Sequence, residues 1–120
     1  MRSYKRSDRV ASLIKDALSE ILVLAVGDPR VVDAVVTFVK VSPDFSIARV
    51  HVRSLVSDDQ GRTSLMAGLA ASRAYLRTEL AHRVLLPRMP QLEFYYDNVE
   101  DEAARLEVIL DRLALERKDG

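Results

Sequence analysis

Residues 70–80 read AASRAYLRTEL, and this stretch decides how the second half of the chain is organised. It holds no glycine or proline, so its composition is typical of a helix. Its apolar spacing nevertheless changes, because one stripe ends at Leu69 and another begins at Leu76. Small side chains fill the join between the two stripes. We therefore expect two helices that meet at a kink formed by Ser72, Arg73 and Ala74.

The first part of the chain predicts a long amphipathic helix that Ser7 or Ser3 would cap. Its buried stripe is expected to consist of Val10, Leu13, Ile14, Ala17, Leu18, Ile21, Leu22 and Ala25. Gly27 and Pro29 favour the end of that helix, and residues 28–30, Asp-Pro-Arg, predict a tight connection.

β-Branched residues then predict two strands, over residues 31–41 and 47–55, joined by a Ser-Pro-Asp turn at residues 42–44. One face of the first strand is expected to carry Val35, Thr37, Val39 and Val41. In the second strand, Arg49, His51 and Arg53 alternate with apolar residues. The pattern indicates an antiparallel hairpin with one covered and one solvent-exposed face.

The second half is expected to continue with a polar loop over residues 56–63 and a helix that begins at Ser64 or Thr63. Gly68 within it indicates close packing against a neighbour or tolerance near the kink. Pro87 and Pro90 favour the end of the helix, and residues 92–97 alternate as a third strand. Asp97 or Asn98 would cap a last helix whose buried stripe is Ala103, Leu106, Ile109, Leu110 and Leu113.

The predicted order is therefore helix, strand, strand, helix–kink–helix, strand, helix. Three short strands with helices on one face make an α+β fold. The 120 residues are expected to form a single domain, with residues 1–6 and 115–120 flexible.

Composition favours a cytoplasmic protein without a membrane span, because cysteine is absent and no run of about 18 apolar residues occurs. The formal net charge is zero, but residues 1–92 carry fourteen Lys/Arg and nine Asp/Glu, whereas residues 93–120 carry four and nine. Most of the basic residues are arginines, which suit phosphate contacts. A GC-rich genome is an equally good explanation of the arginine content.

Catalytic chemistry finds little support in the sequence. His51 and His82 are the only histidines, and neither has a partner at metal-ligand spacing. The acidic residues Asp97, Glu100, Asp101 and Glu102 could hold a divalent cation, but carboxylates are also favoured at a helix N-terminus. We therefore expect no catalytic residue, no metal site, no cofactor and no small-molecule substrate.

The basic residues suggest an anionic partner instead. Arg73 and Arg77 lie four residues apart and share a helix face, where an anion would relieve their repulsion. Tyr75 beside them could stack on a base or belong to the core. The candidate residues for binding this partner, which the resemblance given next implies is RNA, are Arg73, Arg77, Ser72, Arg6, Arg9, Arg30, Arg49, Arg53, Arg83 and Arg88.

Several segments together resemble the ribosome-binding factor A family, bacterial factors that mature the small ribosomal subunit. They are Arg6-Ser-Asp-Arg9-Val-Ala, Asp28-Pro29-Arg30, the hairpin segment at residues 39–50, Ala71-Ser-Arg-Ala-Tyr-Leu-Arg77, and residues 90–97. Their order and spacing cover the chain roughly from Arg6 to Leu113.

The resemblance implies a type II KH-like domain and a non-enzymatic factor, typically needed in the cold. Its partners would be the free 30S subunit and 16S ribosomal RNA, bound as a monomer during late maturation. The family's Ala-x-Gly kink corresponds to Ser72-Arg73-Ala74, so the glycine is missing, and Pro87 stands where an arginine is expected. A protein–protein interaction module is the alternative, followed by a small enzyme that uses the carboxylates of residues 97–102.

Overall fold

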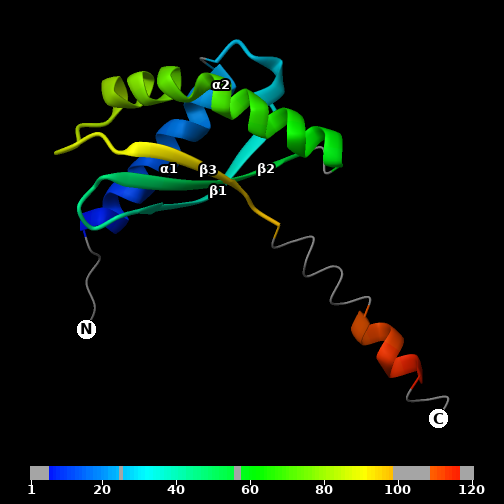
Figure 1. Cartoon of the computed structure of the whole chain (residues 1–120). Helices are drawn as coiled ribbons and strands as arrows, with labels where there is room; N and C mark the ends of the chain where they lie inside the picture. The colour runs from blue at the N-terminus through cyan, green and yellow to red at the C-terminus, as the bar shows by residue number, and fades with distance from the viewer. Residues whose placement is uncertain (1–5, 25, 56–57, 99–108, 117–120) are drawn as a thin grey trace, which may run out of the picture.

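The chain folds around a three-stranded sheet that two long helices cover on one side (Figure 1). This computed structural model describes residues 6–24, 26–55, 58–98 and 109–116. The elements in chain order are α1 (Arg6–Leu24), the 3₁₀ turn η1 (Pro29–Val31), β1 (Ala34–Val41), β2 (Ile47–Ser54), α2 (Asp59–Arg83) and β3 (Gln91–Tyr96). Residues 109–116 are also helical. The predicted α+β class and order of elements are confirmed.

The sheet order is β1-β2-β3, with β1 antiparallel to β2 and β2 parallel to β3. A parallel pair needs a crossover connection, and α2 supplies it by running back across the sheet. Because α1 and α2 pack on the same face, no helix among the described residues covers the opposite face of the sheet, which we call the open face (Figure 1). The predicted covered and solvent-exposed faces are thus confirmed.

One hydrophobic core joins the two helices to the covered face. Ile14 and Leu18 of α1, Val50 of β2, and Leu69 and Leu76 of α2 are all fully buried. Each of these side chains contributes about 1.5–3 kcal/mol by leaving water. The α2 face that carries Leu69 and Leu76 is therefore fixed on the core, and its opposite face points outward.

In its described residues α1 follows the predicted stripe except at Leu13, which is 50% exposed, whereas Ala25 of that stripe lies outside the described residues. Ala11 is buried in its place, because the helix is turned so that Ala11, Ile14 and Leu18 face the sheet. Ser7 lies inside α1 and is buried, so it does not cap the helix, while Ser3 lies outside the described residues. Of the ends expected to be flexible, the structure describes Arg6, which begins α1, and the helical residues 115–116.

The alternation predicted for β1 is wrong in its first half, because the register with β2 shifts between Val36 and Phe38. Thr37 is the extra residue of this β-bulge. Val36 is consequently buried together with Val39 and Val41, whereas Val35 is only partly buried. A period-two pattern cannot reveal such an insertion, because the bulge changes which face every earlier residue points to.

α2 begins at Asp59 rather than at Ser64 or Thr63, because the Asp58 carboxylate accepts the Gly61 N–H at 2.6 Å as an N-cap. Most of the loop expected over residues 56–63 is therefore helical. Gly68 lies against η1, where an added Cβ would come within 2.9 Å of the Arg30 and Val31 side chains. Close packing is thus the correct interpretation of this glycine.

The two helices expected around residues 72–74 are a single helix that continues to Arg83. The two halves of α2 nevertheless run in different directions (Figure 1). The Thr78 hydroxyl donates to the Ala74 carbonyl at 3.0 Å, and such bonds to the preceding turn bend helices. Alanine at position 74 disfavours the positive-φ conformations open to glycine, so the helix stays continuous there.

The burial predicted for the last helix is wrong where the structure describes it. Ile109, Leu110 and Leu113 are 54%, 55% and 51% exposed, whereas Ala103 and Leu106 lie outside the described residues. Periodicity shows that these side chains share a helix face, but it does not provide a surface to cover that face. Among the described helices, none is long and apolar enough to cross a membrane.

Candidate nucleic-acid interface

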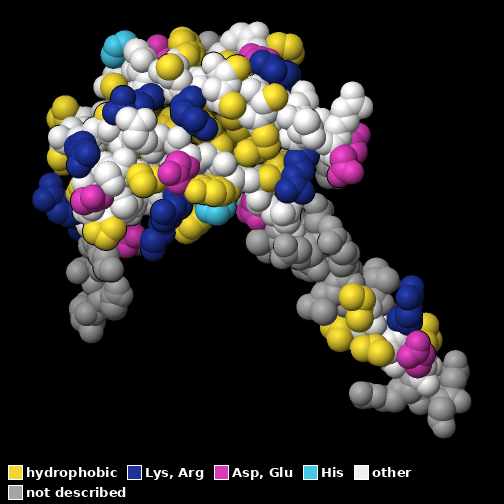
Figure 2. Space-filling model, viewed as in Figure 1, with side chains coloured by type: hydrophobic (Ala, Val, Ile, Leu, Met, Phe, Trp, Pro, Cys, Tyr) yellow, Lys and Arg dark blue, Asp and Glu magenta, His cyan; other side chains and the backbone are white. Residues whose placement is uncertain are grey.

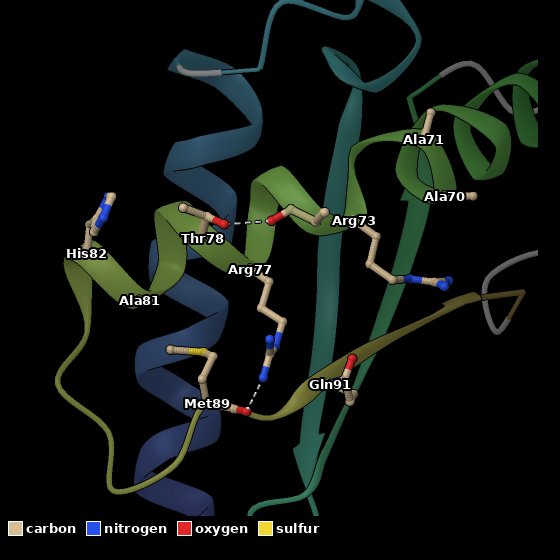
Figure 3. A pocket seen from close by; sticks show the side chains of 10 residues that line it. Ala70, Ala71, Arg73, Arg77, Thr78, Ala81, His82, Met89 and Gln91 are labelled. Carbon is tan, nitrogen blue, oxygen red and sulfur yellow. Dashed lines mark hydrogen bonds between the residues drawn. The ribbon is translucent and has the colours of Figure 1, made fainter.

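A groove runs along the outward face of α2 and is closed on its lower side by the segment that leads into β3 (Figure 3). It encloses about 610 Å³. The small side chains of Ala70, Ala71, Ala74 and Ala81 keep it open on the helix side, and Met89 and Gln91 line it from the other side. The small residues at the predicted kink therefore form the wall of a groove.

Arg77 extends from α2 across this groove to the opposite segment (Figure 3). Its Nε donates to the Pro90 carbonyl at 3.0 Å, and its Nη2 donates to the Met89 carbonyl at 2.8 Å. Both acceptors are uncharged, so the two bonds orient the guanidinium without neutralising it. Arg77 thus has a structural role and also places a fixed positive charge in the groove.

Arg73 lines the same groove one helical turn earlier, and its side chain is exposed. Its guanidinium carbon lies 5.9 Å from the centre of the Phe94 ring, at the outer limit of a cation–π contact. The prediction that Arg73 and Arg77 share one surface is confirmed. Ser72 points the other way and is buried, so it is not part of that surface.

A second groove, of about 440 Å³, lies at one end of the body, where the start of α1 meets the loop after α2. Arg6 and Arg9 line it together with apolar side chains, including Phe45 and Leu85. Phe45 occupies the hairpin turn with φ of 61°, and Leu85 is fully exposed. The sequence marks the two arginines but not these apolar neighbours, which come from distant segments.

Arg30 and Arg83, both candidate residues, are held in hydrogen-bonded ion pairs within the fold. Arg30 binds the Asp28 carboxylate at 2.7 Å, and this hydrogen-bonded contact lowers the pKa of Asp28 and raises that of Arg30. Arg83 binds Glu20 at 2.8 Å and thereby links the end of α2 to α1. A phosphate would have to compete with a carboxylate at either position.

Arg88 lies near the hairpin turn, where its charge is the smallest of the effects that lower the pKa of Asp44 to about 2. Hydrogen bonds from the Ser46 and Ser42 hydroxyls have larger effects. These hydrogen bonds to the Asp44 carboxylate stabilise the predicted Ser-Pro-Asp turn. The turn is therefore a structural feature rather than a ligand site.

The remaining candidates, Arg49 and Arg53, belong to β2 on the open face of the sheet. Arg49 lies 3.5 Å from Glu93 of β3. Between these arginines the structure brings together Phe38, His51 and Tyr95 from three strands. The sequence identified His51 but missed both aromatic neighbours, because cross-strand register was needed to find them.

The acidic cluster that could have held a cation is only partly described. Asp97 accepts a hydrogen bond from the Thr37 hydroxyl at 2.6 Å, so its carboxylate is bound to the β1 bulge. Glu100, Asp101 and Glu102 lie outside the described residues. Within the part of the chain that the structure describes, no three acidic, histidine or cysteine side chains gather as a metal site.

Basic side chains recur on the face of the body that carries α2 and β3, beside a hollow floored by hydrophobic side chains (Figure 2). A groove with hydrophobic walls and arginines that are not paired with carboxylates suits a ligand with apolar rings and phosphates. Nucleic acid combines both.

Comparison with known proteins identifies the family. The family model described as ribosome-binding factor A matches residues 6–110. Ribosome-binding factor A of Methylobacillus flagellatus is 40% identical over 112 residues, which cover 92% of this chain and 86% of the relative.

Two structural comparisons agree with that match. The crystal structure of ribosome-binding factor A from Thermus thermophilus superposes with a TM-score of 0.65 at 30% identity, covering 75% of this chain and 93% of that one. A homology model of the T. thermophilus factor, fitted into the cryo-EM map of a 30S–RbfA complex, gives a TM-score of 0.59 at 30% identity, covering 73% and 91%. The chain belongs to the ribosome-binding factor A family.

Proposed function

We propose that this chain is a cytoplasmic, non-enzymatic assembly factor that binds the free 30S ribosomal subunit through 16S ribosomal RNA. It acts as a single-domain monomer and assists the late maturation and processing of that RNA. The relative fitted into a 30S–RbfA complex supports the choice of partner, because this chain shares its family and its fold.

The observation that carries the proposal is the pair of arginines in the α2 groove. Arg77 is immobilised by two backbone carbonyls, whereas Arg73 is exposed and can swing toward a ligand. A fixed cation beside a mobile one suits a phosphodiester backbone, which presents charges at regular intervals. The alanines that line the groove beside them let that backbone approach the helix closely.

The other arginines contribute according to how they are held. Arg6 and Arg9 line the second groove and extend the basic surface to the end of the body. Arg30 and Arg83 contribute less, because each already binds a carboxylate. The mechanism is occupancy: the bound factor restrains ribosomal RNA elements until maturation is complete, and the shape of the RNA rather than a base code selects the site.

The proposal is tested by sedimenting the full-length chain with purified 30S subunits at low salt. Arg73→Glu should move the protein from the subunit fraction to the top of the gradient, while its thermal unfolding stays unchanged because the side chain is exposed. Arg77→Lys keeps the positive charge but loses the forked guanidinium group that donates both hydrogen bonds. This variant should bind subunits more weakly and unfold at a lower temperature.

A matched control is Lys15→Glu, which makes the same change of charge at an exposed position of α1 away from the groove. It should sediment like the wild type. Normal sedimentation of Arg73→Glu, or failure of the wild-type chain to sediment with subunits, would contradict the proposal.

A further inference from the structure

Three aromatic side chains form a row across the open face of the sheet. Phe38 of β1 is paired in register with His51 of β2, which is paired in turn with Tyr95 of β3. The centres of the Phe38 and His51 rings are 5.6 Å apart, and those of His51 and Tyr95 are 5.5 Å apart. The His51 and Tyr95 rings are inclined by only 27°. The Phe38 and His51 rings are inclined by 52°, so the row consists of three adjoining rings at different tilts.

This row is exposed where side chains of this size are usually covered. Phe38 is 52% exposed and Tyr95 is 41% exposed, whereas the opposite face of the same strands is buried. The β-bulge at Thr37 sets the register that places Phe38 opposite His51. Bulges of this kind often re-aim a side chain near a functional site.

Cations border the aromatic row. Two residues along from Phe38 and His51, on the same face of the sheet, Lys40 of β1 is paired with Arg49 of β2, which is paired with Glu93 of β3. Two like charges directly opposite each other destabilise a sheet, and among the described residues Glu93 is the carboxylate that pairs with Arg49. That carboxylate is also occupied, since Glu93 accepts the Tyr95 hydroxyl at 2.7 Å and lies 3.5 Å from Arg49. An anionic ligand would relieve the repulsion between Lys40 and Arg49.

We propose that this open face is a second RNA site, at which bases of a single-stranded segment stack on Phe38, His51 and Tyr95 while its phosphates lie over Lys40 and Arg49. The inference rests on the proposed function and adds a site separate from the α2 groove. Aromatic rings beside cations favour single strands, because the bases of a duplex are already stacked and their faces are hidden. An acidic protein surface would use the cations but not the ring faces.

The test measures binding of the full-length chain to a labelled ten-nucleotide polyadenosine RNA and to an RNA duplex of ten base pairs, by fluorescence anisotropy. The single strand should bind more tightly than the duplex. Phe38→Ala and Tyr95→Ala should each weaken binding of the single strand by about 5- to 100-fold, as expected for the loss of one stacked base. Tyr95→Phe keeps the ring and should retain most of the affinity.

Leu24→Ala is the matched control, because it removes an exposed apolar side chain from α1, away from the sheet face. If Phe38→Ala unfolds, Phe38→Leu removes the π-system while keeping the bulk, and it should show the same loss of binding. Unchanged affinity in the Phe38 and Tyr95 variants would overturn the inference, and so would equal affinity of the wild type for the single strand and the duplex.

A second measurement separates this site from the α2 groove. Photo-crosslinking of the oligonucleotide should map to β1 and β3, and Arg73→Glu should lose sedimentation with 30S subunits while retaining most of its affinity for the single strand. If Arg73→Glu abolishes oligonucleotide binding and the aromatic variants do not, the groove is the only RNA site. If crosslinks from the sheet face on intact subunits reach only protein, the face docks a protein and the inference fails.

Discussion

At the scale of the residue, Arg77 and Arg73 differ in their contacts, although the sequence alone does not distinguish them. Arg77 donates two hydrogen bonds to carbonyls of the segment before β3, and Arg73 is exposed. Arg77→Met should therefore lower the free energy of unfolding by about 1–3 kcal/mol, because two partly buried carbonyls lose their partner. Arg73→Met should change it by about 0.5 kcal/mol or less. Urea unfolding of the two variants measures the difference, and equal values would contradict it.

Asp44 provides a prediction about pH. Hydrogen bonds from Ser46 and Ser42 lower its pKa in the folded state from 3.8 to about 2. A lowered folded-state pKa means that the ionised carboxylate stabilises the native turn above about pH 4, and that this stabilisation is lost as the pH falls toward 2. Asp44→Asn should thus be less stable than the wild type at pH 6, and thermal unfolding should show the difference shrinking between pH 4 and pH 2. A constant difference would mean that the ionised carboxylate is not responsible.

At the scale of the element, the contact between α2 and η1 depends on Gly68. Alanine there would gain about 1 kcal/mol in helix propensity, yet its Cβ would lie 2.9 Å from the Arg30 and Val31 side chains. Val31 is fully buried and cannot move aside easily. Gly68→Ala should therefore lower the free energy of unfolding by about 1–3 kcal/mol, as overpacking does. Ala67→Gly at the neighbouring position controls for propensity, and a more stable Gly68→Ala variant would show that η1 gives way.

The elements were largely predictable from the sequence, and the exceptions share a cause. The α1 stripe, the hairpin, β3 and the ends set by Pro87 and Pro90 follow from local patterns. The bulge at Thr37 depends instead on a shift in strand register, and the early start of α2 at Asp59 depends on one capping hydrogen bond. The expected break into two helices at residues 72–74 is wrong, because a change in apolar spacing does not require an interruption of the helix, and α2 is continuous there.

At the scale of the whole molecule, the fold was easier to predict from the sequence than the surroundings of the candidate arginines. It brought Arg73 and Arg77 together because they share a helix. It could not show that Arg30 and Arg83 bind carboxylates, or that Phe38 and Tyr95 flank His51. These contacts depend on tertiary packing or on side-chain rotamers. The periodicity of a sequence contains information on neither.

Charge segregation across the molecule leads to the last prediction. The chain has no net charge, yet its first 92 residues carry five more cations than anions, so it can bind RNA electrostatically. The logarithm of its affinity for 30S subunits should fall linearly with the logarithm of salt concentration, because each neutralised phosphate releases a counterion. Arg73→Ala should reduce the slope by about 1, whereas Phe38→Ala should weaken binding without changing the slope, since stacking releases no counterion. Binding titrations between about 50 and 200 mM salt distinguish the two variants. A slope near zero for the wild type would mean that apolar contacts rather than phosphate contacts hold the factor on the subunit.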